Sequence, residues 1–354
     1  MKIAQVSPLC EAVPPRLYGG TERVVAQLTD ALVRLGHDVT LFAAADARTS
    51  AQLVACRDQS IRLDPAPLCS DVAAHLNMIA EVRDRADAFD VIHFHTDLLQ
   101  FPLFNDRPQQ TLTTLHGRLD LKDLPQAYER WSDFPLVSIS DAQRRHLPRG
   151  AWAGTVHHGL DPSLFRYSPR GDGYLAFLGR ISPEKRPDRA IEIALKLGRK
   201  LRIAAKVDAV DKAYFEEKIE PLILGQPLVD YIGEIGDAQK PDFLGGADAV
   251  LFPIDWPEPF GLVMIEAMAC GTPVIAFDAG ATREVVEPGV TGFVVRSVDE
   301  AVGAVRRIES LDRALVRRRF DARFTSEVMA GAYVDLYAQR VAASRPRAFF
   351  AFGA

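Results

Sequence analysis

The chain has 354 residues, of which 48% are hydrophobic and 25% charged, and its formal net charge is −5. This length suits two domains rather than one core, and the acidic balance excludes a global basic field for binding nucleic acid. No apolar run reaches the length of a bilayer span, so membrane association is not indicated. The four cysteines are scattered without metal-type spacing, and we expect no signal peptide before the first strand. Both features predict a cytoplasmic protein with free thiols.

The first half of the chain alternates strand-like and helix-like segments. Its longest helical pattern, at 21–37, has apolar residues at helical spacing and Thr21 as the expected N-cap. The other expected elements are strands at 2–9, 38–44, 90–96, 109–117, 135–140 and 154–159, and a helical stretch at 71–88. This alternation predicts a parallel sheet with helices on both faces.

A stretch rich in Pro, Gly and charge at 160–173 interrupts the pattern and is typical of a linker between domains. The alternation then restarts. The expected strands are 174–182, 200–207, 228–235, 249–254 and 273–278, and the expected helices are 187–198, 213–224, one beginning at Gly261, and the segments after 297. The sequence therefore predicts two doubly wound α/β domains joined near residue 165. Ligands of such sheets bind beyond the carboxyl ends of the strands, so a cleft between the domains is the expected site.

Two glutamates mark the stretch "EPFGLVMIEAMACGTPVIAFD" at 258–278. Glu266 is the only charged residue of an otherwise apolar helix, and Glu258 stands eight positions earlier between two prolines. Burying an unpaired carboxylate destabilises a fold by roughly several kcal/mol, so Glu266 needs hydrogen-bond donors. The hydroxyls of a ribose and of a second sugar would supply them to Glu266 and Glu258. The alternative is that Glu266 pairs with an arginine and Glu258 is a surface residue.

A pair of cations occupies the stretch "GRISPEKRPDRA" at 179–190. Arg180 ends a strand, and Lys185 precedes a helix that Pro187 helps to begin. A guanidinium binds two phosphate oxygens at once, and an ammonium adds a point charge. These residues predict a diphosphate site.

Two weaker patterns lie in the first half. Gly19 and Gly20, in "YGG", would let backbone N–H groups approach a phosphate, although Gly-Gly before a helix is more often a simple turn. His116 ends a strand in "TLHG" and could contact a sugar hydroxyl, although a single histidine is more often structural.

In this order, the four patterns resemble the family 4 retaining glycosyltransferases of the GT-B fold, together with "DVIHFHT", "SIS" and "HHGLD". The resemblance spans nearly the whole chain. It implies two facing Rossmann-like domains with a cleft between them: an acceptor-side domain at 1–165 and a donor domain at 170–325. It also implies that a final helix at about 327–345 packs back onto the first domain.

The resemblance implies the donor, the acceptor and the site residues. The donor would be a nucleotide-sugar, with UDP-glucose as the first candidate and GDP-mannose as the alternative, and the acceptor a small molecule or a glycan. Neither a metal nor another cofactor is implied. Catalytic roles fall to His116, Arg180, Lys185 and Glu258, and donor-binding roles to Gly19, Gly20, Lys206, Ile232, Glu234, Ile235, Phe260, Gly261, Leu262 and Glu266. His158 departs from the family, which often has Asn there, and Lys206 follows a strand that usually leads into a glycine-containing loop.

Other functions of such folds stay open from the sequence. A sugar-nucleotide epimerase would keep the nucleotide site without an acceptor, and a non-catalytic sugar-nucleotide-binding protein would keep the fold alone. A dinucleotide-dependent dehydrogenase lacks its GxGxxG fingerprint after a strand here.

Overall fold

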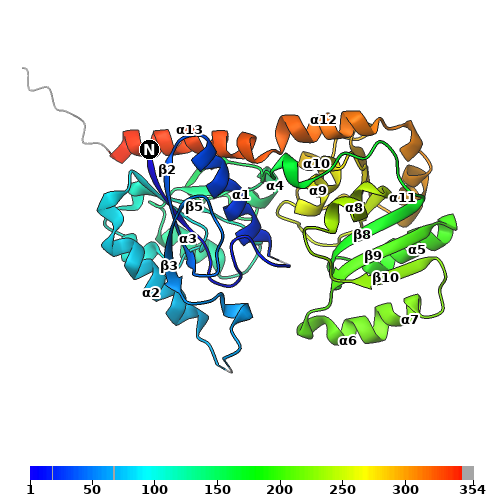
Figure 1. Cartoon of the computed structure of the whole chain (residues 1–354), viewed down its shortest axis with the longest axis horizontal. Helices are drawn as coiled ribbons and strands as arrows, with labels where there is room; N and C mark the ends of the chain where they lie inside the picture. Colours follow the sequence, from blue (N-terminus) through cyan, green and yellow to red (C-terminus); the bar gives the residue numbers. More distant parts are fainter. Residues whose placement is uncertain (18, 67, 345–354) are drawn as a thin grey trace, which may run out of the picture.

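The computed structural model describes residues 1–17, 19–66 and 68–344, and it shows two α/β halves side by side (Figure 1). Each half contains one sheet whose neighbouring strands are all parallel. The predicted fold class is therefore confirmed. Tyr18, in the predicted glycine loop, and residue 345, in the predicted final helix, lie outside the described residues.

The N-terminal half has a seven-stranded sheet in the order β3-β2-β1-β4-β5-β6-β7. Its strands are β1 (Lys2–Val6), β2 (Asp38–Ala44), β3 (Gln52–Arg57), β4 (Val91–Phe94), β5 (Thr111–Thr114), β6 (Leu136–Ser138) and β7 (Trp152–Thr155), and its helices are α1 (Gly20–Arg34), α2 (Asp71–Asp84), α3 (Leu124–Arg130) and α4 (Asp141–Arg144). The order reverses between β1 and β4, and a reversal of this kind opens a crevice at the carboxyl ends of the strands.

The C-terminal half has a six-stranded sheet in the order β10-β9-β8-β11-β12-β13. Its strands are β8 (Tyr174–Arg180), β9 (Lys200–Lys206), β10 (Val229–Gly233), β11 (Ala247–Phe252), β12 (Val274–Phe277) and β13 (Gly292–Val295). Its helices are α5 (Pro187–Leu197), α6 (Lys212–Tyr214), α7 (Glu220–Ile223), α8 (Lys240–Gly245), α9 (Leu262–Ala269), α10 (Thr282–Val285), α11 (Val298–Val305) and α12 (Arg313–Arg323). This order reverses between β8 and β11. A second crevice is therefore expected there, at the carboxyl ends of the strands, as in the N-terminal half.

The observed elements differ from the expected ones mainly at the sheet edges. Strands β3 and β13 were not expected, and both are edge strands with half-buried residues, which gives them a weak apolar pattern. The strand expected at 154–159 ends at Thr155, so His157 and His158 belong to the loop after β7. Helix α1 begins at Gly20 with Gly19 before it, so Thr21 is in the first turn rather than at the N-cap.

Helix α13 (Ser326–Ser344) lies on the N-terminal half although it is the last described element of the chain (Figure 1). It packs against α1, β4 and β5, and its Tyr333 and Tyr337 are fully buried in the same cluster as residues of α1. The chain crosses between the halves twice, and the crossings pair at Leu160, whose N–H donates to Phe324 O and whose C=O accepts from Ser326 N.

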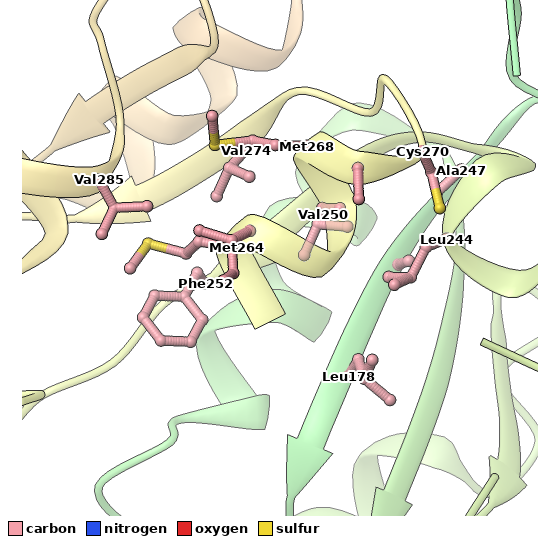
Figure 2. Close-up of a cluster of buried hydrophobic side chains, with 14 of the residues drawn as sticks. Leu178, Leu244, Ala247, Val250, Phe252, Met264, Met268, Cys270, Val274 and Val285 are labelled. Atoms are coloured by element: carbon pink, nitrogen blue, oxygen red, sulfur yellow. The ribbon is translucent and has the colours of Figure 1, made fainter. Parts of the chain in front are cut away.

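Helix α9 is buried in the core of the C-terminal half. Figure 2 shows Met264 and Met268 of α9 among side chains from β11 and β12, with Phe252 beside Met264. A helix that is apolar on nearly all sides must be covered on all sides, so the position of α9 is fixed by packing. Its first turn is thereby held rigidly at the end of β11.

Candidate active site

A cavity of about 580 Å³ lies between the two halves. It is lined by residues at or just beyond the carboxyl ends of strands from both sheets, including His116 after β5, Arg180 at the end of β8 and Lys206 at the end of β9. The start of α9 and the start of α1 also border it. Both crevices therefore open into one space, which is large enough for a small organic ligand.

Most residues expected at the site line this cavity. They are Gly19, Gly20, His116, Arg180, Lys185, Lys206, Glu234, Ile235, Glu258, Phe260, Gly261, Leu262 and Glu266. Ile232 does not line it, because its side chain packs against the hydrophobic core around α9, and its expected donor-binding role stays a prediction. Successive side chains of a strand point to opposite faces, so a strand that borders a cavity also has side chains that face away from it.

Glu258 is buried at the mouth of the cavity rather than on the surface, with 8% of its area exposed. Its Oε2 accepts from Lys185 Nζ and, at 3.1 Å, from Trp256 Nε1. The Lys185 ammonium also lies 4.8 Å from the centre of the Trp256 ring, a cation–π distance. Ser140 Oγ of the N-terminal half donates to Pro259 O at 2.6 Å. The loop that carries Glu258 is thus held from both halves.

Gly280 fixes the backbone of Glu258. A Cβ atom at this glycine would lie 2.2 Å from Glu258 O and 2.4 Å from Glu258 N, and its φ of +57° disfavours other residues. We expect Gly280→Ala to displace Glu258 and to lower activity by at least about 100-fold, the range for losing one aligned polar group at a reacting centre. Steady-state rates and a melting curve check this. Gly303→Ala, where no atom lies within 4 Å, is the matched control, and equal activity of both variants would contradict the prediction.

Glu266 is 2% exposed and already has a cation beside it. Lys240 Nζ of α8 donates to its Oε1 at 2.8 Å and also lies 3.3 Å from Asp237 Oδ1. Asp237 in turn pairs with Arg23 of α1. The alternative partner expected for Glu266 was an arginine, and the observed one is a lysine that itself lines the cavity. This row of alternating charges links the two halves.

The two cations at the ends of β8 and β9 lie among carboxylates. Arg180 contacts Glu184 at 2.5 Å, Asp208 at 3.5 Å and Asp211 at 3.6 Å, and Lys206 Nζ lies 2.8 Å from Asp208. Desolvation would raise the pKa of Glu184, but hydrogen bonds from its own backbone N–H and from Arg180 hold that pKa below its usual value. An entering diphosphate would therefore compete with three acids for Arg180.

Sequence reasoning passed over several residues that line the cavity. Lys240 lies in "KPDFLGGAD", which resembles a connecting loop but forms α8. Glu22 is 5% exposed, and burial raises the pKa of its carboxyl. Arg62 comes from a segment without a motif, and Trp256 stands two positions before Glu258, although no role was expected for it. A glutamate in the first turn of an expected helix could have been noticed in the sequence. The positions of Lys240, Arg62 and Trp256 at the cavity depend on tertiary folding.

The sequence models of two glycosyltransferase families match consecutive parts of the chain. "Glycosyltransferase Family 4" matches residues 18–178, and "Glycosyl transferases group 1" matches residues 166–323. Together they span both halves and the cavity. The chain belongs to the group 1 glycosyltransferases.

Several relatives of this glycosyltransferase match more than nine-tenths of its length. The phosphatidyl-myo-inositol mannosyltransferase of Mycobacterium leprae is 26% identical over 91% of this chain and 90% of the relative. The glycogen synthase of Mycobacterium tuberculosis is 26% identical over 92% of each chain. A glycosyltransferase involved in avilamycin A biosynthesis has a TM-score of 0.75 at 26% identity, over 96% of this chain and 98% of the other. These likenesses confirm the GT-B fold and a transferase activity.

A second solved structure shows the fold alone. Anabaena HepE, in complex with UDP and glucose, has a TM-score of 0.75 at 20% identity, over 96% of this chain and all of the other. Within the described ranges of the glycosyltransferase, no helix is long and apolar enough to cross a membrane. Nor is any group of three or more His, Cys, Asp or Glu there placed to hold a metal ion.

Proposed function

We propose that this glycosyltransferase moves a hexose from a nucleoside diphosphate sugar, UDP-glucose first, to a hydroxyl of a small-molecule or glycan acceptor, with retention and without a metal. One observation supports this most: a single interdomain cavity contains two buried carboxylates, Glu258 and Glu266, and the cations Arg180, Lys185 and Lys206. Carboxylates accept from sugar hydroxyls and cations bind phosphates, so the cavity has complementary groups for both ends of such a donor.

The proposed reaction follows the charges. When the bond between C1 of the hexose and the phosphate oxygen breaks, the sugar becomes positively charged and the diphosphate gains negative charge. Lys185 and Arg180 would stabilise that leaving group, and helix N-termini would add partial positive charge. The acceptor oxygen would bond to C1 on the face that the diphosphate leaves, and its proton would go to a phosphate oxygen of the donor. This route needs no carboxylate nucleophile from the protein.

The proposal assigns the ribose to Glu266 and the hexose to Glu258 with the backbone of 260–262. The acceptor would enter from the N-terminal half, where Glu22 and Arg62 line the cavity. The relatives' names differ in their sugars: one is a mannosyltransferase, one a glycogen synthase, and HepE was solved with UDP-glucose. GDP-mannose is therefore kept as the second donor. The four unpaired cysteines support a reducing compartment, and we place the enzyme in the cytoplasm.

Titration with UDP, GDP and ADP, followed by a screen for donor hydrolysis, tests the proposal because leakage to water needs no acceptor. We expect one diphosphate to bind at least about tenfold more tightly than the other two, a difference of about 1.4 kcal/mol. The sugar nucleotide with that base should release its diphosphate slowly, and chelation with EDTA should not change the rate. Strict dependence on a divalent metal would overturn the metal-free assignment, and tighter binding of GDP would replace UDP-glucose by GDP-mannose.

A further inference from the structure

A chain of buried hydrogen bonds leads from helix α13 to the cavity wall. Tyr337 OH accepts from Gln5 Nε2 at 2.9 Å, and Gln5 Oε1 accepts from His95 Nε2 at 2.9 Å. His95 Nδ1 then lies 2.8 Å from Nε2 of His116, which lines the cavity. Tyr337 and Gln5 are fully buried and His95 is 3% exposed, so water does not compete for these bonds. Burying polar groups at the centre of a sheet costs free energy unless they are paired. The presence of this row of hydrogen bonds therefore suggests a function for it.

Gln5 sets the direction of the bonds. A neutral imidazole or a hydroxyl can exchange its donor and acceptor roles, but an amide nitrogen only donates and an amide oxygen only accepts. With Oε1 toward His95, the proton of His95 must be on Nε2, and its Nδ1 is an acceptor. His116 must then donate from Nε2, which leaves its Nδ1 without a proton.

His116 lines the cavity, and one of its ring nitrogens is bonded by no described residue. His116 Nδ1 is buried and has no hydrogen-bond partner within the part of the chain that the structure describes. The ring of His158 stacks on that of His116 at 5.3 Å and 18°, which restrains its orientation. Burial lowers the pKa of His116 to about 3 and that of His95 well below its usual value, so both rings are neutral at physiological pH.

We propose that Gln5 and His95 are positioning residues that keep Nδ1 of His116 a bare hydrogen-bond acceptor, so that the cavity selects a ligand group that donates, such as a hydroxyl. The inference rests on the proposed function only for the identity of that ligand, a hydroxyl of the transferred sugar or of the acceptor. The row of bonds ends at Tyr337 of α13, whose OH accepts from Gln5 Nε2. A carboxylate or carbonyl oxygen at the same position would meet a lone pair and be rejected.

The test reads the tautomer of His116 in the ligand-free protein. In protein labelled with ¹⁵N-histidine, protonated and unprotonated ring nitrogens have well-separated shifts, and His116→Gln assigns the resonances by their loss. We expect wild-type His116 to be protonated at Nε2 only. Gln5→Met removes both amide bonds and should give a mixture of the two tautomers. A wild-type ring protonated at Nδ1, or an unchanged single tautomer in Gln5→Met, would overturn the proposal.

Gln100→Met is the matched control because Gln100 is also a fully buried amide of this half, bonded to Thr96, Asp97 O and Thr113 and absent from the chain of bonds. Both Gln100→Met and Gln5→Met should have a lower Tm than wild type, but Gln100→Met should keep the single His116 tautomer. In donor hydrolysis, Gln5→Met should lose about 3- to 10-fold in kcat relative to Gln100→Met, the worth of one hydrogen bond. Equal rates for the two would refute a role in turnover. If no sugar nucleotide binds at all, the proposed function fails, while the tautomer result still decides this inference.

Discussion

Replacing Lys185 by alanine is expected to lower donor hydrolysis and transfer by about 100- to 1,000-fold, the range for removing one preorganised group that stabilises developing charge. Lys185 holds Glu258 and would face the leaving diphosphate, so the substitution removes a cation and also frees the carboxylate. Glu258→Ala should lose activity by a similar factor, because Lys185 would then lack its partner and the hexose its acceptor oxygen. Both effects should appear mainly in kcat, since the charge develops in the transition state.

An exposed pair on α5 provides the control. Lys196 Nζ lies 3.3 Å from Glu192 Oε1, and both side chains are about half exposed. Lys196→Ala and Glu192→Ala remove the same chemical groups far from the cavity, and pairs of this kind contribute only about 0.3–0.5 kcal/mol. Their rates should match wild type. Wild-type turnover in either Lys185→Ala or Glu258→Ala, with intact folding, would refute the assignment of the site.

Lys240→Met is expected to make the ligand-free protein less stable and to increase the rise in Tm that a bound nucleotide causes. The substitution leaves Glu266 buried without a cation, and breaking a buried pair in this way costs about 3 kcal/mol or more. A bound ribose would supply two O–H donors to the bare carboxylate. Part of the lost stability should therefore return on binding, because a ligand stabilises the state that it binds. The rise in Tm with saturating nucleoside diphosphate should exceed that of wild type by several degrees.

Comparing a nucleoside diphosphate with its dideoxy analogue isolates the contribution of the ribose hydroxyls to binding. A 2′,3′-dideoxy analogue of the same diphosphate keeps the base and phosphates but lacks both hydroxyl donors. With it, Lys240→Met should show no larger rise in Tm than wild type does. An equal extra rise with both nucleotides would mean that Glu266 does not hold the ribose. Glu266→Gln should reduce binding of the full nucleotide and leave binding of the dideoxy analogue nearly unchanged.

The fold and most cavity residues could be predicted because the signals were local. Alternating apolar strands and helices indicate a parallel sheet, and the residues at strand ends converge by topology alone. Arg180 ends a strand, His116 follows another one closely, and Glu266 stands out as a single charge in an apolar helix, so each of them had a visible pattern. These features depend on spacing along the chain and need no knowledge of distant contacts.

The rest depends on contacts between segments far apart in sequence. Nothing in "KPDFLGGAD" indicates that Lys240 would reach Glu266, because that contact is set by the packing of α8 on α9. Similarly, Gln5 is one polar residue in a strand, and its meaning appears only when Tyr337 arrives from α13. The side chain of Ile232 faces the core rather than the cavity, a direction that the residue types of its segment do not reveal.

The position of α13 has a consequence for biosynthesis. The first domain in space is not a continuous stretch of sequence, since the 19 residues of this helix complete one of its hydrophobic faces. During translation, those residues leave the ribosome only after the entire C-terminal domain has been made. The nascent N-terminal domain must therefore wait, until its neighbour is finished, for the helix that completes the cluster around Val24, Leu28 and Leu32.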